Sequence, residues 1–549
     1  MNSENLDFHD YYVLSAKSGY SQEIQNENDV FSIDDMQKVA NNKVTAKQAK
    51  VLCGSSFAKH NYFVTEYVIP FFCSQPVGIT VNDKDGKIWI ASTWNGYLIV
   101  FDPKIGFFSD YIKIPNWKTK NEFGSMVWGM DFDKNGDLWF TDQINNAIWR
   151  YFVNTSKFEM YKIPTQGSYP VSVSFDSTNR VWFSEIFGKK LGLIDPSKTV
   201  NGTSSGIKEY PFEDKIKDDF TTMGPAIVAS KKEVQKNNES YKHQIDRDHE
   251  KEIVWFTVVD YPRGGSVIGF DLENENFHVY ELPEKSGVPV GVVQDDDGNL
   301  WINDHATNLF FMLEPDSGNI KQYSTSIPNT RNTTTLPYYN EYKDGKIWFN
   351  EHEGNAIAYF DIKNNTLVEY HIPTKNTVWG NTSNPLKFAI DNNGSIWFTE
   401  WTENKIGFLD YKKISNLPIS LSLSKEEIVL DKKINLLKDT IQIYVNKNIE
   451  QENKVNDSTT NFYNQFESDK YIEMIISSTI SKTGRLWNMT HNFEKNNIFM
   501  YEIPDDGPLK INLELIADKN IVPGNYTLTI SARYDNIVTY SKIIDLIVK

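Results

Sequence analysis

A repeated tryptophan constrains the fold of this chain more than any other feature of its sequence. A hydrophobic residue, a tryptophan and an aromatic or aliphatic residue recur seven times, mostly at spacings in the forties, at Trp89, Trp139, Trp182, Trp255, Trp301, Trp348 and Trp397. The one wide gap, before Trp255, contains a charged insertion from about 230 to 252. Self-similarity at this period indicates a repeat architecture in which each copy is one small supersecondary unit.

Each copy carries the signals of four short antiparallel strands. A proline-led strand opens most copies, as at Pro76, and an Asp-Gly or Asn-Gly pair often follows, at 85–86, 135–136, 297–298, 344–345 and 393–394. Such pairs supply the positive φ that two-residue hairpin turns require. The tryptophan strand comes next, then a third strand, then a fourth that ends in an aromatic residue and Ile-Pro or a similar pair. Four strands per unit are typical of a β-propeller blade.

The seventh copy stops after its third strand, near Asp410, and its fourth strand is found at the other end of the chain. Phe63-Val-Thr-Glu-Tyr-Val-Ile-Pro70 matches the fourth-strand pattern and precedes the first copy. Pairing there would cover strand edges that otherwise invite aggregation. The sequence therefore predicts an all-β protein built on a seven-bladed β-propeller closed by an N-terminal strand.

From about Leu417 the tryptophan signature is gone and alternating strands continue to the end of the chain. Strands with turns and no helical period predict a separate β-sandwich. The Pro523-Gly-Asn-Tyr-Thr-Leu stretch resembles the penultimate strand of immunoglobulin-like modules. We expect a flexible N-terminal arm over 1–55, with a short helix around 34–50, a propeller over 56–415 and an immunoglobulin-like sandwich over 416–549.

The composition limits the classes of partner that the protein can bind and the places where it can be located. The net charge of −17 argues against nucleic acid, whose binding needs a basic face. No apolar run is long enough for a membrane span, and the first fifty residues lack a signal-peptide pattern. We expect a monomer at the cell surface or otherwise outside the cytoplasm, with a cytoplasmic location as the alternative. Cys53 and Cys73 flank the closing strand and form either a disulfide or two reduced thiols.

Residues three positions after each repeat tryptophan are predicted to ring one mouth of the central channel. They are Ser92, Asp142, Glu185, Val258, Asp304, Glu351 and Glu400, five of them carboxylates. Converging carboxylates repel unless they are paired, protonated or bridged by a cation, and an oxygen-rich cluster suits Mg²⁺ or Ca²⁺. The alternative is that each carboxylate bonds the backbone of a neighbouring loop in its own blade.

Two histidines and several aromatic residues accompany these carboxylates. His305 and His352 each follow one, and His352 is the candidate general base. The aromatic candidates for an apolar ligand wall are Trp94, Trp128, Tyr338, Tyr339, Trp379 and Trp401. The competing interpretations are solvent-facing turn histidines and ordinary packing between blades.

The units Val181-Trp-Phe-Ser-Glu185 and Ile396-Trp-Phe-Thr-Glu-Trp-Thr-Glu-Asn-Lys-Ile-Gly-Phe-Leu-Asp410 resemble the repeat of streptogramin B (virginiamycin B) lyases, over about 60–412. The resemblance implies a seven-bladed propeller with Mg²⁺ at the channel mouth and elimination chemistry on a cyclic depsipeptide. The family's functional histidines match Tyr338 and Leu386 here, and its upstream Glu ligand matches Asn384; only Glu400 has the family's residue. Gluconolactonase- and paraoxonase-type propellers, which bind Ca²⁺, resemble the chain more loosely.

Two functions follow as hypotheses. The first is a ligand-binding or interaction protein at the cell surface, taking a small molecule, a glycan or a protein. The second is a metal-dependent lyase or lactonase-type hydrolase that uses a relocated site around Glu351, His352 and Glu400.

Overall fold

The computed structural model describes residues 53–54, 57–71, 73–117, 119–120, 123–212, 221–231, 251–260, 264–413, 417–448, 471–486, 489–491, 498–504 and 506–549. Within these ranges the regular structure is nearly all β, with one short 3-10 helix, η2 (Thr377–Trp379). The helix expected around 34–50, most of the arm over 1–55, most of the charged insertion and the boundary at 415–416 lie outside the described residues.

Six four-stranded antiparallel units follow one another along the chain, each with its repeat tryptophan on the second strand. The first three comprise β2 (Pro76–Asn82), β3 (Lys87–Ser92), β4 (Tyr97–Asp102) and β5 (Phe107–Lys113); β8 (Met130–Phe132), β9 (Leu138–Asp142), β10 (Ala147–Phe152) and β11 (Lys157–Lys162); and β12 (Ser174–Phe175), β13 (Val181–Glu185), β14 (Lys190–Ile194) and β15 (Ile207–Pro211). A small hairpin, β6 (Thr119–Lys120) and β7 (Phe123–Gly124), links the first two.

The next three units repeat the same order. They comprise β16 (Thr221–Lys231), β17 (Lys251–Asp260), β18 (Gly264–Asp271) and β19 (Asn276–Glu281); β20 (Pro289–Gln294), β21 (Leu300–Asp304), β22 (Leu309–Glu314) and β23 (Asn319–Ser324); and β24 (Pro337–Lys343), β25 (Lys346–Glu351), β26 (Ala356–Asp361) and β27 (Thr366–His371). The charged insertion joins β16 to β17, the first and second strands of its unit, as the sequence predicts.

The seventh unit draws on both ends of this region. Its first three strands are β28 (Pro385–Ile390), β29 (Ile396–Glu400) and β30 (Lys405–Leu409), and its fourth is β1 (Val64–Val68). β1 runs antiparallel to β30 with Val64 opposite Leu409 and Val68 opposite Lys405. The pairing expected of the N-terminal strand is therefore present.

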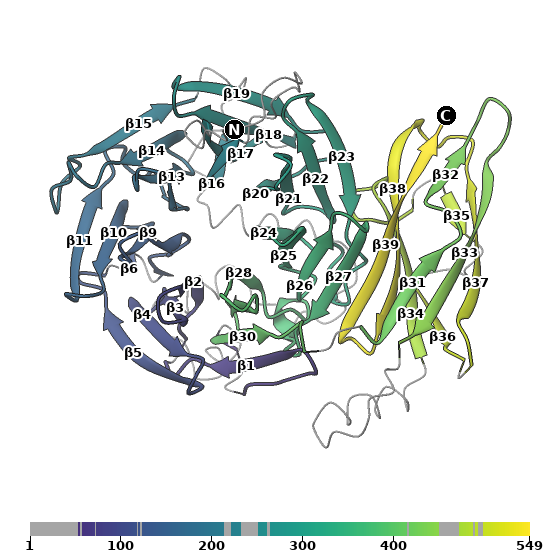
Figure 1. The fold of residues 1–549 in the computed structure, drawn as a ribbon, viewed down its shortest axis with the longest axis horizontal. Helices are drawn as coiled ribbons and strands as arrows, with labels where there is room; N and C mark the ends of the chain where they lie inside the picture. Colours follow the sequence, from purple (N-terminus) through teal and green to yellow (C-terminus); the bar gives the residue numbers. More distant parts are fainter. Residues whose placement is uncertain are drawn as a thin grey trace, which may run out of the picture.

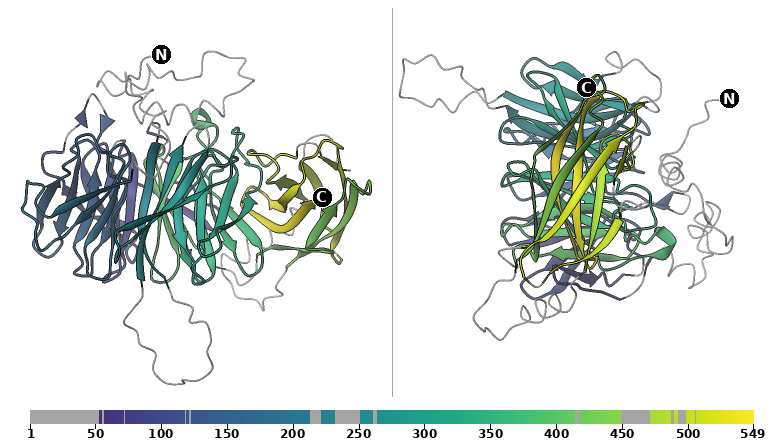
Figure 2. Two further views of the ribbon diagram at one scale, coloured as in Figure 1. Left: turned by 90° about the horizontal axis from the view of Figure 1, so that it is seen from above. Right: turned by 90° about the vertical axis from the view of Figure 1, so that its right-hand side faces the viewer.

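The units are arranged in a propeller-like ring with their first strands innermost (Figure 1). β2 contacts both β8 and β28, and β16, β20, β24 and β28 contact one another in succession. Seen from the side, the ring is a disc with the C-terminal strands beside it (Figure 2). Among the residues that the structure describes, no helix has the length and apolar character of a membrane span.

The repeat tryptophans are all buried, and in four of them a local hydrogen bond satisfies the indole N–H. Trp139, Trp182, Trp301 and Trp397 each donate to an aspartate six residues earlier, at 2.8–3.1 Å. In the second unit that aspartate, Asp133, also accepts from the turn amides of Asn135 and Asp137. The same aspartate thus stabilises the turn and gives the buried indole a hydrogen-bond acceptor, which avoids the desolvation penalty of an unpaired buried donor.

The C-terminal region forms two further sheets whose apolar faces share one hydrophobic cluster. One contains β31 (Ile419–Leu423), β33 (Lys438–Lys447), β37 (Leu509–Ala517) and β35 (Met489–His491). The other contains β39 (Val538–Val548), β38 (Gly524–Tyr534), β34 (Tyr471–Ser478) and β36 (Ile498–Glu502), with β32 (Glu427–Leu430) parallel to β39.

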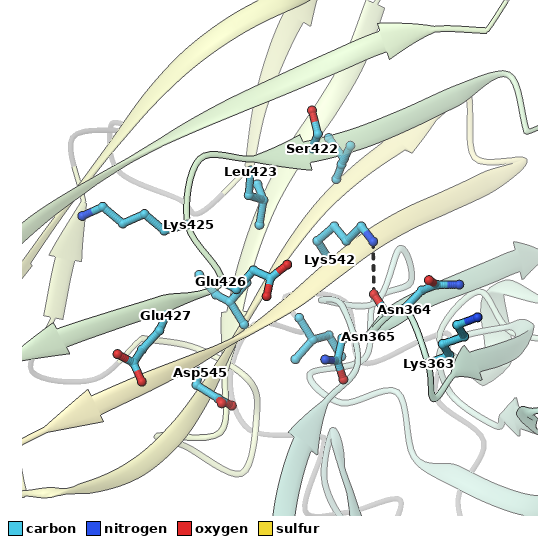
Figure 3. A pocket seen from close by; sticks show the side chains of 13 residues that line it. Lys363, Asn364, Asn365, Ser422, Leu423, Lys425, Glu426, Glu427, Lys542 and Asp545 are labelled. Atoms are coloured by element: carbon cyan, nitrogen blue, oxygen red, sulfur yellow. Dashed lines mark hydrogen bonds between the residues drawn. The ribbon is translucent and has the colours of Figure 1, made fainter.

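The second of these sheets continues directly into the sixth unit, a feature that the sequence pattern did not predict. β27 pairs antiparallel with β39, so one nine-stranded sheet crosses from the ring into the C-terminal region. All six residues of β27 are buried, whereas the outer strand β5 is mostly exposed. A groove lined by Lys363, Asn364, Asn365, Lys425, Lys542 and Asp545, among others, lies at this junction (Figure 3).

A buried arginine fastens the same junction. Arg533 on β38 is 2% exposed; its guanidinium donates to Glu473 (3.1 Å), to Thr539 (3.2 Å) and to the carbonyl of Ile327 in the linker before β24. Thr539 in turn bonds the ring of His371 at 2.7 Å. A charge buried this deeply must be compensated, and its partners come from both sides of the junction.

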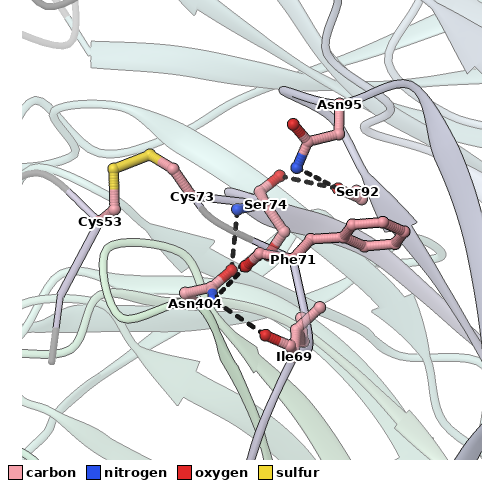
Figure 4. Close-up of a disulfide and its surroundings, with 8 residues drawn as sticks. All are labelled: Cys53, Ile69, Phe71, Cys73, Ser74, Ser92, Asn95 and Asn404. Atoms are coloured by element: carbon pink, nitrogen blue, oxygen red, sulfur yellow. Dashed lines mark hydrogen bonds between the residues drawn. A yellow bond between two sulfur atoms is a disulfide. The ribbon is translucent and has the colours of Figure 1, made fainter. Parts of the chain in front are cut away.

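Cys53 and Cys73 are joined by a disulfide beside the seventh unit (Figure 4). Close by, Asn404, just before β30, donates to the carbonyls of Ile69 and Phe71 and accepts from the amide of Ser74. The side chain of Asn404 therefore holds the segment that leads from β1 to β2.

Replacing Arg533 with Ala should lower the free energy of unfolding by about 3 kcal/mol, because it leaves the buried hydroxyl of Thr539 and the carbonyl of Ile327 without their donor and the part-buried Glu473 without its cation. The matched control is Lys321→Ala, which removes an exposed ion pair (Lys321 to Asp545, 2.8 Å) across the same junction and should cost less than about 1 kcal/mol. Denaturant unfolding followed by tryptophan fluorescence measures both. If both variants lost less than about 1 kcal/mol of unfolding free energy, the result would contradict a stabilising role of Arg533 at the junction.

Candidate functional site

Side chains from six units meet at one end of the inner strands. A single hydrophobic cluster of buried side chains contains Val77, Trp128, Val171, Ile186, Tyr338 and Leu386. Six partly buried side chains pack against it: Met126, Tyr169, Phe187, Val290, Tyr339 and Trp401. We call these twelve residues the mouth cluster. They are spread over the sequence from Val77 to Trp401, and they come together only because the inner strands of all these units begin at the same place.

The structure brings most of the predicted aromatic ligand residues to this place. Trp128, Tyr338 and Trp401 belong to the mouth cluster, and the rings of Trp379 and Trp401 lie 6.1 Å apart. Trp379 also packs against the disulfide. Trp94 sits apart on the β3–β4 turn, half-buried, where its amide donates to the carbonyl of Ser74.

The two predicted histidines form a pair beside Tyr338. His305 Nε2 and His352 Nδ1 are 2.9 Å apart, and the rings are nearly parallel with an angle of 7°. The ring of Tyr338 lies 4.7 Å from that of His305. Burial lowers the pKa of both histidines, that of His352 to about 3. Both imidazoles are therefore neutral at pH 7, and one donates to the other.

Two of the predicted carboxylates bond their own surroundings. Asp142 accepts from the hydroxyl of Ser125, from Asn145 and from the indole of Trp149. Asp304 accepts from the backbone amides of Gly287 (2.6 Å), Val288 (2.7 Å) and Ala306 (3.1 Å). These contacts are of the kind that the local interpretation of the repeated carboxylate describes.

Glu185 and Glu400 occupy identical settings in the third and seventh units. Each lies across the strand pair from a lysine, Lys190 or Lys405. That lysine binds a second glutamate on the outer strand: Lys190 Nζ is 2.9 Å from Glu209, and Lys405 Nζ is 3.0 Å from Glu66. In the third unit the hydroxyl of Thr165 completes the cluster, and in the seventh the hydroxyl of Thr374 does so.

The charge state of these two glutamates follows from their burial. Burial raises the pKa of Glu185 to about 8, and it raises the pKa of Glu400 well above its ordinary value. The lysine is already engaged by the outer glutamate, so it only partly opposes this shift. The carboxyl of Glu185 is consequently protonated at pH 7, and burial displaces the equilibrium of Glu400 in the same direction.

The sixth unit varies this arrangement. Glu351 and Glu369 occupy the two glutamate positions, but Ala356 stands where the third and seventh units have lysine. Burial and the neighbouring Glu369 raise the pKa of Glu351, and the positive charge of Arg533 opposes that rise. The C-terminal region thus supplies a cation to this glutamate pair, which has no lysine opposite it.

Among the residues that the structure describes, no three His, Cys, Asp or Glu side chains come together as a group that could hold a metal ion. The Mg²⁺ or Ca²⁺ site at Asp142, Glu185, Asp304, Glu351 and Glu400 therefore stays a prediction.

A polar layer lies next to the mouth cluster on the inner strands. It comprises Tyr339, which belongs to both, and four residues that the sequence analysis missed: Thr80, Asp131, Glu341 and Lys387. Thr80, Asp131 and Glu341 stand opposite the repeat tryptophans of the first, second and sixth units. This register is the signal by which they could have been found, because the residue opposite each repeat tryptophan lies on the innermost strand.

No protein-family model and no curated protein matches the chain. Solved structures are similar to it. Virginiamycin B lyase from Staphylococcus aureus is 21% identical with a TM-score of 0.48, covering 63% of this chain and 98% of that one. A streptogramin B lyase structure is 22% identical with a TM-score of 0.48, covering 63% and 97%. An extracellular domain from B. thetaiotaomicron is 14% identical with a TM-score of 0.44, covering 87% and 57%. The propeller-like arrangement follows from the strand pairing above rather than from these likenesses.

The raised pKa of Glu185 predicts a pH dependence with a definite sign. Folded Glu185 holds its proton up to about pH 8, whereas the unfolded carboxyl loses it near its ordinary value of 4.5. The unfolded state then binds fewer protons, so the free energy of unfolding falls as pH rises between these values. Glu185→Gln should therefore be more stable than wild type at pH 8, by at least about 1 kcal/mol, and equal to it at pH 4.

Denaturant unfolding at the two pH values measures this gain. Glu275→Gln, in the exposed pair with Lys208, is the control and should bring no gain at pH 8. The same pH dependence in wild type and Glu185→Gln would show that Glu185 is ionised in the folded protein.

Proposed function

We propose that the chain is a ligand-binding or interaction protein whose site is the mouth cluster. The observation that carries this proposal is the convergence of aromatic and aliphatic side chains from six units on one place. Apolar and aromatic side chains with a few polar groups among them are the usual lining of a small-molecule site. The neutral pair His305 and His352 supplies such polar groups at its edge.

We further infer that the seven units form a closed seven-bladed β-propeller and that the C-terminal sheets form an immunoglobulin-like sandwich. The pairing of β1 with β30 and the succession of contacts between inner strands support closure. The single apolar cluster between the two C-terminal sheets supports a sandwich. Its continuous sheet with β27 would make it a rigid extension of the propeller rather than a tethered module.

The expected setting is the cell surface or another extracytoplasmic location, with the protein as a monomer. The disulfide between Cys53 and Cys73 supports an oxidising environment, since disulfides persist there and are rare in the cytosol. The ligand would be a small molecule, a glycan or a protein segment; the net charge of −17 disfavours nucleic acid.

A metal-dependent lyase or lactonase-type hydrolase is the second candidate, favoured by the contact between His305 and His352 beside Tyr338. His352 would be its base and Glu351 and Glu400 its metal ligands. The positions that carry histidine in the lyase family, Tyr338 and Leu386, belong here to the mouth cluster. Heat on titration with Mg²⁺ or Ca²⁺ that disappears in Glu400→Gln would favour this candidate over the binding protein.

The binding proposal predicts that the dye anilinonaphthalene sulfonate, which fluoresces in apolar sites, binds at the mouth. Tyr338→Ser and Trp401→Ala should weaken its binding at least about tenfold, since each removes a large apolar contact. Fluorescence titration of the full chain measures the dissociation constants, with melting temperatures as the check on folding.

The matched control is Phe107→Ser on the outer strand β5, which removes a 70%-exposed aromatic side chain and should leave dye binding unchanged. Equal dye binding in wild type and both mouth variants would contradict the proposal.

A further inference from the structure

The polar layer beside the mouth cluster contains a lysine in an unusual state. Lys387 on β28 is 9% exposed, yet its ammonium forms no hydrogen bond and no ion pair with the described residues. Instead Nζ lies 3.8 Å above the ring of Tyr339 on β24. Buried lysines are ordinarily paired, as Lys405 is with Glu66.

The acidic neighbours of Lys387 are committed to other contacts. Glu341 accepts from the hydroxyl of Tyr339 at 3.0 Å, and Asp131 accepts from the hydroxyl of Thr80 at 3.1 Å and from the amide of Phe132. Burial raises the pKa of Glu341 to about 7, whereas Asp131 is exposed. Their charges act on Lys387, but they do not outweigh its burial, which lowers the pKa of the ammonium to about 8.

The position of this lysine ties it to the mouth cluster. Leu386, the preceding residue, belongs to that cluster, and Tyr339 both packs against it and lies under the ammonium. A ligand whose apolar body occupies the cluster would therefore present its far end to Lys387. An amine that is desolvated in this way, with little competition from partners, is the setting in which lysine becomes a nucleophile.

We propose that Lys387 is a carbonyl-reactive amine, which binds the aldehyde or ketone group of an apolar ligand in the mouth cluster by forming an imine. This inference rests on the proposed binding role of the mouth cluster and specifies the ligand class. No oxidant or reductant is needed.

The step balances as a condensation. The lone pair of Lys387 Nζ forms a bond to the carbonyl carbon, and the carbonyl oxygen takes up a proton. The nitrogen gives up its two protons, the carbon–oxygen bond breaks, and the oxygen leaves as water with an imine as the second product. Glu341, held by Tyr339, is the neighbouring acid that can supply and receive these protons.

The test traps the imine on the full chain. Benzaldehyde and sodium cyanoborohydride are added at pH 7, and the benzylated lysines are located and quantified by peptide mass spectrometry. Lys387 should be modified at least about tenfold faster than exposed lysines such as Lys198, because more of its amine is unprotonated. Anilinonaphthalene sulfonate should slow modification at Lys387 alone.

Lys285 is the internal control. It is half-buried with its pKa also lowered, and its Nζ lies 4.6 Å over the ring of Tyr526, but that group donates to the carbonyl of Thr479. It should react more slowly than Lys387. Lys387→Arg should lose this adduct while other lysines react as before; mapping of the wild type decides the matter even if that variant fails to fold.

The outcomes distinguish failure of the imine proposal from failure of the proposed binding role of the mouth cluster. Modification of Lys387 no faster than that of Lys285 or Lys198, in protein that still binds the dye at the mouth, would overturn the imine proposal and leave the binding role standing. Failure of the dye to bind at the mouth would overturn the binding role itself.

Discussion

The backbone pairing of β1 with β30 is the interaction on which the rest of this structure depends. It joins residues more than 330 positions apart and gives the seventh unit its fourth strand. Two further contacts strengthen the junction: the buried pair of Lys405 with Glu66, and the side-chain bonds of Asn404 to the β1–β2 segment. The disulfide joins the residues on either side of β1. Without this pairing the inner strands of the first and seventh units would have no reason to meet.

The meeting of inner strands creates two layers of different chemistry. The mouth cluster collects apolar side chains from the beginnings of the strands, and the polar layer with Asp131, Glu341 and Lys387 lies next to it. Both layers contain residues that are distant in sequence, so neither exists in any single unit. The repeat positions, in contrast, serve their own units: Asp142 and Asp304 bond nearby turns, and Glu185 and Glu400 sit in matching clusters with lysine.

Much of the ring was predictable because its signals are local. The repeat tryptophans lie on the predicted strands. The glycines of the Asp-Gly and Asn-Gly turns, such as Gly86 and Gly394, have the predicted positive φ, and the displaced strand forms at Val64–Val68. The junction with the C-terminal region was not predictable from pattern. The pairing of β27 with β39 joins strands that are far apart in sequence. That Arg533 acts on Glu351, which has Ala356 instead of a lysine opposite it, becomes visible only when the sixth unit is compared with the third and seventh. Sequence spacing also left open whether the repeated carboxylates converge, since it fixes neither side-chain direction nor protonation.

Hydrogen–deuterium exchange of the backbone amides of β1 tests closure of the ring most directly. If β1 is a structural strand of the seventh unit, its amides that face β30 should exchange as slowly as those of β29, at the centre of the same sheet. Exchange of the β1 amides at the rate of an unstructured peptide, with β29 still protected, would contradict the account.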